Sequence, residues 1–156
     1  MKKSFLFSVL FLAFVVFQSP VSKAQTGKSD ALETLGSITG MLMYNTYVGI
    51  GSIGDGYEEG VYDAKYVGDV MDEQVSGIKA VNAQLLVLLN SGFLDDEADL
   101  SFMRDVRTTF DLLINEAEKL KEYAASTDQG DADKFQSYRK QAWSKISDLL
   151  GLGDEE

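Results

Sequence analysis

The tyrosines and glycines between residues 34 and 68 are the side chains whose type and spacing most favour a binding surface. Tyrosine supplies a rigid amphipathic ring, and glycine lets another backbone come close. We therefore predict a protein-binding surface formed by Tyr44, Tyr47, Tyr57, Tyr62 and Tyr66. The structural alternative is that these tyrosines close one end of a helical bundle, with their rings buried and their hydroxyls in water.

Residues 49–54 read Gly-Ile-Gly-Ser-Ile-Gly and match the G-x-G-x-x-G pattern of dinucleotide-binding proteins. That pattern binds phosphate only between a strand and a helix N-terminus in a parallel sheet. The sequence predicts no such sheet, so we expect no cofactor. We expect the glycines from Gly49 to Gly60 to form the turn between two helices, because glycine costs about 1 kcal/mol inside a helix. Gly36 and Gly40 are expected to let the first helix pack closely.

The same region carries no charge from Thr34 to Gly54, which makes membrane contact an alternative. An uncharged segment of this length can span a bilayer as a helix, and Gly36 and Gly40 form a small-xxx-small pair. Several polar residues make the stretch only mildly apolar: Ser37, Thr39, Asn45, Thr46 and Ser52. We therefore prefer protein binding as the function of this stretch and keep membrane contact as the alternative.

The chain contains neither histidine nor cysteine. Imidazole zinc sites, Ser-His-Asp and Cys-His nucleophile systems and Glu-x-x-His di-iron sites therefore cannot form. Catalysis would depend on Asp, Glu, Tyr, Lys or Ser alone, so we predict a protein that is not an enzyme, with no catalytic residue and no cofactor. Hydrolysis of a glycosidic bond by paired carboxylates is the enzymatic alternative.

Acidic residues gather in three places, which suggests calcium binding as an interpretation. The clusters are Asp55/Glu58/Glu59, Asp95/Asp96/Glu97/Asp99 and Asp128/Asp131/Asp133. None has the alternating carboxylates and glycine of an EF-hand loop, so we expect helix starts and solvated loops and no metal site. The formal net charge of −11 opposes binding to a phosphate backbone, so we expect no nucleic-acid partner and a preference for basic ones.

Two further residues interrupt the apolar pattern of the helices. Gln74 lies within an apolar seam, where it either sets the register of packing or contacts a ligand. Trp143, the only tryptophan, has Ile146 and Leu150 three and seven residues on, which favours a core or seam position. Stacking of Trp143 on a sugar or a peptide is the alternative.

Helical periodicity predicts the elements that position these residues. The expected helices run from about Asp30 to Ile53, from about Tyr57 to Asn90, from Asp96 or Asp99 to Ala125, and from an Asp131 cap to Leu150, with Gly151 ending the last. The second carries a heptad-like seam, and the run 85–89 is apolar on every side, so we expect it to be buried. Short connections favour antiparallel neighbours. We predict an all-α protein, an antiparallel up-down bundle of about four helices.

The N-terminus has the features of a secretory signal peptide. Lys2 and Lys3 precede the apolar run 5–17, and Ser22-Lys23-Ala24 offers small residues where a signal peptidase cleaves. We predict cleavage before Gln25, which removes three lysines and changes the net charge from −11 to −14. A retained membrane anchor is the alternative, but the apolar run is shorter than the roughly 20 residues of a spanning helix.

The predicted organisation is a signal peptide at 1–24, one helical domain at 25–152 and an acidic frayed tail at 153–156. The mature protein is expected to be soluble in the periplasm or secreted. We predict a non-enzymatic interaction or structural module that binds an envelope or extracellular protein, with self-association through helix seams as a further possibility. An accessory subunit of an envelope-spanning secretion or conjugation machine is the alternative function.

Overall fold

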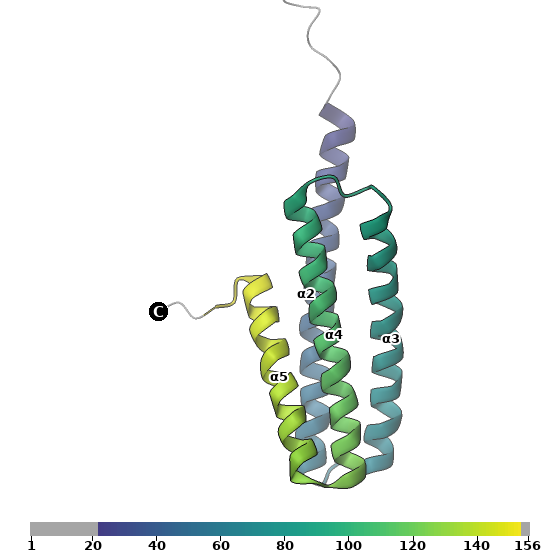
Figure 1. Ribbon diagram of the computed structural model, residues 1–156, viewed down its shortest axis with the longest axis vertical. Helices are drawn as coiled ribbons and strands as arrows, with labels where there is room; N and C mark the ends of the chain where they lie inside the picture. The colour runs from purple at the N-terminus through teal and green to yellow at the C-terminus, as the bar shows by residue number, and fades with distance from the viewer. Residues whose placement is uncertain (1–21, 154–156) are drawn as a thin grey trace, which may run out of the picture. The chain divides into compact units, whose positions relative to one another are not determined.

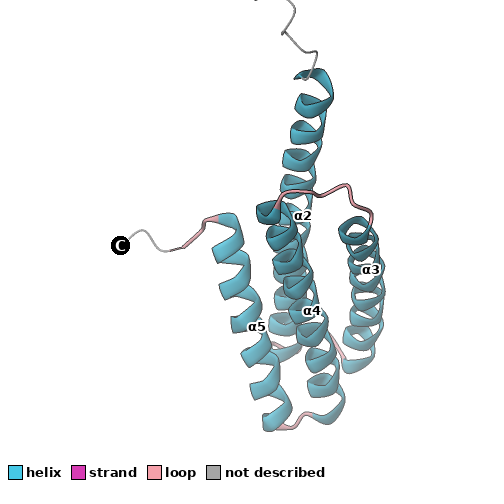
Figure 2. Cartoon of the chain, turned by 45° about the horizontal axis from the view of Figure 1, so that its top comes forward, coloured by secondary structure: helices cyan, strands magenta, loops and turns pink. Residues whose placement is uncertain are grey.

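The computed structural model describes residues 22–153, and four α-helices account for nearly all of them (Figure 1). No strand occurs in this described range (Figure 2). The helices are α2 (Ser22–Glu58), α3 (Ala64–Asn90), α4 (Glu97–Ser126) and α5 (Gln129–Leu150). The predicted all-α class and its bundle of helices are confirmed.

By its internal contacts the chain divides into one unit ending at Gly36 and a second beginning at Ser37. In the first unit, the described residues 22–36 form the N-terminal part of α2. The second unit contains the rest of α2 and the three later helices. All packing described below lies within this second unit.

Helix α4 packs against both α3 and α5, and it lies between them in Figure 1. On α3 and α4, residue numbers run in opposite directions, because Asp72 pairs with Lys121 while Lys79 pairs with Glu118. Because it packs against both neighbours, α4 has more buried residues than α3 or α5. They are Met103, Val106, Thr109, Phe110, Leu113, Ile114, Glu116, Ala117, Leu120 and Ala124.

Side-chain caps set most of the helix starts. Asp63, Asp96 and Asp128 each accept a hydrogen bond from a backbone N–H in the first turn of the following helix. The predicted cap at Asp131 is wrong, because Asp128 caps α5 one turn earlier. Gly151 does end α5 in the left-handed conformation, at φ 64°, and the Leu152 N–H donates to the Ser147 carbonyl at 2.8 Å.

The predicted turn from Gly49 to Gly60 is wrong. Helix α2 continues through Gly49, Gly51, Gly54 and Gly56 to Glu58, and only Gly60, at φ 73°, belongs to the turn. The predicted start of the first helix near Asp30 is also too late, since α2 begins at Ser22. The sequence has no proline after Pro20, so no proline ring interrupts α2 between Ser22 and Glu58.

Close packing against α5 explains why Gly40, Gly51 and Gly54 lie inside a helix. A Cβ at Gly40 would lie 2.7 Å from Leu150 Cδ2, and one at Gly54 would lie 2.8 Å from Phe135 Cζ. A larger residue at either position would force the facing side chain of α5 to move. The contact between helices therefore outweighs the low helix propensity of glycine, and the expectation that Gly40 permits close packing is confirmed.

The apolar run 85–89 is less buried than expected. Leu85 is buried, but Leu86 and Val87 are exposed, by 42% and 63%. Helix α3 presents one stripe to the core, formed by Val67, Met71, Val75, Ile78, Asn82 and Leu85. Because the run has apolar residues all round the helix, some of them must face solvent.

Two glycine substitutions on α2 test this packing. Gly54→Ala places a methyl group against the buried Phe135 ring, so we expect the free energy of unfolding to fall by about 1–2 kcal/mol despite the better helix propensity of alanine. Gly49→Ala is the matched control, because a Cβ there meets nothing within 4 Å. It should raise stability by about 0.5–1 kcal/mol. Urea unfolding followed by circular dichroism measures both, and equal effects of the two changes would contradict the packing.

Candidate functional site

An uncharged stripe of side chains runs along the outward face of α2. Ile38, Met41 and Val48 expose 54%, 63% and 43% of their surfaces, and Asn45 and Ser52 continue the stripe at helical spacing. Leu42 and Tyr44 border it, also exposed. We call this set of residues, Ile38, Met41, Leu42, Tyr44, Asn45, Val48 and Ser52, the outer α2 face. Adjoining apolar side chains on a soluble surface are typical of an interaction site.

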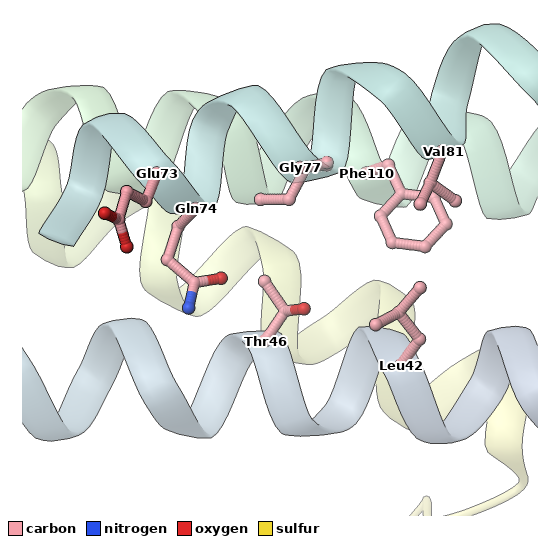
Figure 3. A pocket seen from close by; sticks show the side chains of 8 residues that line it. Leu42, Thr46, Glu73, Gln74, Gly77, Val81 and Phe110 are labelled. Carbon is pink, nitrogen blue, oxygen red and sulfur yellow. The ribbon is translucent and has the colours of Figure 1, made fainter.

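A groove between α2 and α3 adjoins this face and has a volume of about 260 Å³. Figure 3 shows Leu42 pointing across it from α2, with Val81 and Phe110 opposite, and Gln74 pointing from α3 toward Thr46. The groove is open at Gly77, which has no side chain, and Glu73 stands at its rim. The site thus offers apolar walls, an amide and a hydroxyl, with one carboxylate at the edge.

The predicted tyrosines are divided among three places. Tyr47 stacks on Trp143 of α5 at 5.4 Å between ring centroids, and Tyr44 lies 6.4 Å from the same ring. Tyr57 donates a hydrogen bond to the Ala124 carbonyl at 3.0 Å. Tyr62 and Tyr66 stack on each other at 4.7 Å near the start of α3.

Of the five predicted tyrosines, only Tyr44 therefore belongs to the outer α2 face. The aliphatic members of that face, Ile38, Met41 and Val48, were not among the residues predicted from the sequence. Their spacing of three and seven residues, within a stretch without charges, was the available signal. Gln74 is half-buried in the groove, and Trp143 lies at the edge of the α2–α5 seam, 38% exposed.

Glu116 is a second feature that was not predicted from the sequence. Its side chain is completely buried, and neither carboxyl oxygen has a hydrogen-bond partner among the described residues. Burial raises the pKa of Glu116 to about 8, while the positive charge of Arg139 acts in the opposite direction. Glu116 lies on the α4 stripe that also carries Thr109, Leu113 and Leu120. That 4-3-4 spacing was the signal in the sequence.

Arg139 occupies the apolar stripe of α5, between the buried Phe135 and Ala142. Its guanidinium donates to both carboxylate oxygens of Asp55 on α2, at 2.7 and 3.2 Å. These bonds raise the pKa of Arg139, so it stays protonated. The lack of a side chain at Gly51 leaves space for this guanidinium, because a Cβ there would lie 2.7 Å from Nη2 of Arg139. The pair joins the C-terminal part of α2 to the middle of α5.

The acidic clusters have structural roles in the described part of the chain. Asp55 binds Arg139, Asp96 and Asp128 cap helices, and Asp131 accepts hydrogen bonds from Ser126 and Lys134. Between residues 22 and 153, no three Asp or Glu side chains lie close enough together to hold a metal ion. Over the same range, no helix combines the length and the apolar character needed to span a membrane.

Comparison with known proteins adds no relative: the chain matches no family model, no curated protein and no solved structure.

The buried carboxyl of Glu116 predicts a particular pH dependence of stability. In the folded chain it keeps its proton up to about pH 8, whereas the ordinary pKa of 4.5 applies after unfolding. Its contribution is therefore fully present below about pH 4.5 and is lost as the pH rises toward 8, by roughly 1 kcal/mol per pH unit. Glu116→Gln should remove this dependence and should be the more stable protein at neutral and mildly alkaline pH.

Urea unfolding of both proteins at several pH values between about 5 and 9 measures the effect. The difference between wild type and Glu116→Gln isolates this one group, because all other carboxyls are common to both proteins. A difference that does not change with pH would contradict the assignment.

Proposed function

We propose that this protein is an exported, non-enzymatic binding module that docks an apolar protein segment on the outer α2 face and in the adjoining groove. The observation that carries the proposal is the adjacency of the two: the exposed Ile38 lies one helical turn before Leu42, and Leu42 also lines the groove. Helical partners bind such surfaces by laying apolar side chains at helical spacing into a groove.

Charge defines the chemistry of the partner. Glu73 stands at the rim of the groove, and Glu58 and Glu59 are exposed at the C-terminal end of α2. The chain as a whole has a net charge of −11. A partner segment with an apolar stripe flanked by lysine or arginine complements this surface, whereas an acidic segment is repelled.

The proposed export of the protein favours a partner in the cell envelope or outside the cell. The proposed signal peptide, residues 1–24, lies outside the described residues except for Ser22 to Ala24, which form the beginning of α2. After its removal the protein is proposed to be soluble in the periplasm or secreted. The final residues of the proposed acidic tail, 154–156, also lie outside the described range.

Export predicts a defined mature N-terminus. When the full-length gene is expressed in a bacterial host, mass spectrometry of the protein from the periplasm or medium should find Gln25 as the first residue. The physical reason is the pair of small residues, Ser22 and Ala24, at the positions that the peptidase recognises. Recovery of uncleaved chain in the membrane fraction would contradict the export proposal and support a retained anchor.

The docking proposal predicts a charge-dependent affinity. The probes are a designed amphipathic helical peptide with lysines beside its apolar stripe and a twin with glutamates in their place. We expect the lysine peptide to bind the mature protein and the glutamate peptide to bind at least about tenfold more weakly. Equal affinity of the two peptides, or no binding of the lysine peptide, would overturn the proposal.

Matched surface variants locate the site. Met41→Lys should weaken binding of the lysine peptide by about tenfold or more, because it replaces apolar contact area with a repelling charge. Val87→Lys on α3 is the control, since Val87 and Met41 are both 63% exposed and the substitution adds the same charge. Chemical shift changes in the protein, together with titration calorimetry, report the site and the affinity.

A further inference from the structure

Three helices bring Glu116, Arg139 and Gly51 to one level of the second unit. One turn away, the Leu120 and Phe135 side chains both approach Gly54, with Leu120 Cδ1 3.5 Å and Phe135 Cζ 2.8 Å from the position of a Cβ there. Glu116 precedes Leu120 by four residues on α4, and Arg139 follows Phe135 by four on α5. Because the two helices run in opposite directions, the carboxyl and the guanidinium lie at the same height.

Arg139 therefore interacts with two carboxyl groups: it donates hydrogen bonds to Asp55, and its charge acts on Glu116. Asp55, which is half exposed, now holds it with two hydrogen bonds. Glu116 is completely buried, and its carboxyl group forms no hydrogen bond with any described residue. A neutral carboxyl does not compete for a guanidinium that Asp55 already binds. A buried carboxylate does, since charges attract far more strongly in a medium of low dielectric constant than at a solvated surface.

We propose that Glu116 is a proton-operated switch on the clamp that Arg139 and Asp55 form between α2 and α5. With its proton in place, Glu116 leaves Arg139 bound to Asp55, and the clamp is closed. When the proton passes to solvent water or hydroxide, the carboxylate draws the guanidinium inward, and Asp55 is released. No bond other than hydrogen bonds forms or breaks.

Arg139 is the cation that an ionised Glu116 would attract, because the other charged groups nearby are paired elsewhere. On α2, the groups that face Arg139 are Asp55 and the Tyr47 hydroxyl. On α3, the charged groups at neighbouring levels are committed elsewhere, Asp72 to Lys121 and Lys79 to Glu118. On α4 itself, Lys119 pairs with Glu122. Burial raises the pKa of Glu116 to about 8, so the exchange falls in the neutral to mildly alkaline range.

The switch acts on the attachment of α2 to α5, whichever partner the outer α2 face binds. Release of Asp55 leaves the glycine contacts and the stacking of Tyr47 on Trp143 to hold the two helices together at this level. The proposal therefore stands or fails independently of the proposed function.

Trp143 provides the readout, because it is the only tryptophan and lies one turn beyond Arg139 on α5. The experiment follows tryptophan fluorescence of the wild-type protein between about pH 6 and pH 9, with far-UV circular dichroism at each point. We expect one reversible transition with a midpoint near pH 8 and an unchanged helical signal. Carbon-13 NMR of the Glu116 carboxyl should titrate with the same midpoint. A flat fluorescence profile in the wild type would overturn the proposal.

Three variants separate the switch from general effects of pH. Glu116→Gln keeps the shape of the side chain without its charge, and its fluorescence should stay at the wild-type pH 6 value throughout. Asp55→Asn opens the clamp at every pH, so its emission at pH 6 should move toward that of the wild type at pH 9. Glu118→Gln is the matched control, an exposed glutamate two residues away, and should titrate as the wild type does. Persistence of the transition in Glu116→Gln would overturn the assignment.

Discussion

The close approach of α2 to α5 is the constraint on which the rest of the second unit depends. Gly40, Gly51 and Gly54 give α2 a surface without side chains, and Leu150, Arg139 and Phe135 fill the space that they leave. At each of these positions the contact between helices outweighs the low helix propensity of glycine. The cost of glycine in a helix, about 1 kcal/mol per residue, is offset by apolar area and hydrogen bonds that no larger residue permits.

This contact also determines how α2 meets solvent. Since its glycine side is turned toward α5 and its buried residues Met43 and Ile50 toward the core, the remaining uncharged residues must face outward. The outer α2 face is thus the geometric complement of the glycine contact. The groove beside it has a similar origin, because Gly77 on α3 leaves space that Gln74 and Val81 only partly fill.

The sequence predicted the features that depend on local patterns, and its errors fall where tertiary contacts decide. The all-α class and the Gly151 cap follow from neighbouring residues, and both are confirmed. The predicted start of the second helix near Tyr57 is wrong, because α2 extends to Glu58 and α3 begins at Ala64. The turn expected at Gly49–Gly60 failed because propensity alone cannot reveal that Phe135 and Arg139 occupy the space beside the helix. The burial of Glu116 was hidden for a similar reason: a charged residue beside an apolar seam normally faces water. The tyrosines, close in sequence, are separated because Tyr57 lies almost three turns beyond Tyr47 on α2, while Tyr62 lies in the following loop and Tyr66 on α3.

The fit of Arg139 against Gly51 has a consequence for how this protein changes over evolutionary time. A side chain at position 51 would force the guanidinium of Arg139 to move, since a Cβ at 51 would lie 2.7 Å from it. Loss of the arginine would in turn leave Asp55 without the cation that it binds and Glu116 without a positive neighbour. Positions 51, 55, 116 and 139 are therefore physically coupled, so a substitution at one of them changes the effect of a substitution at the others.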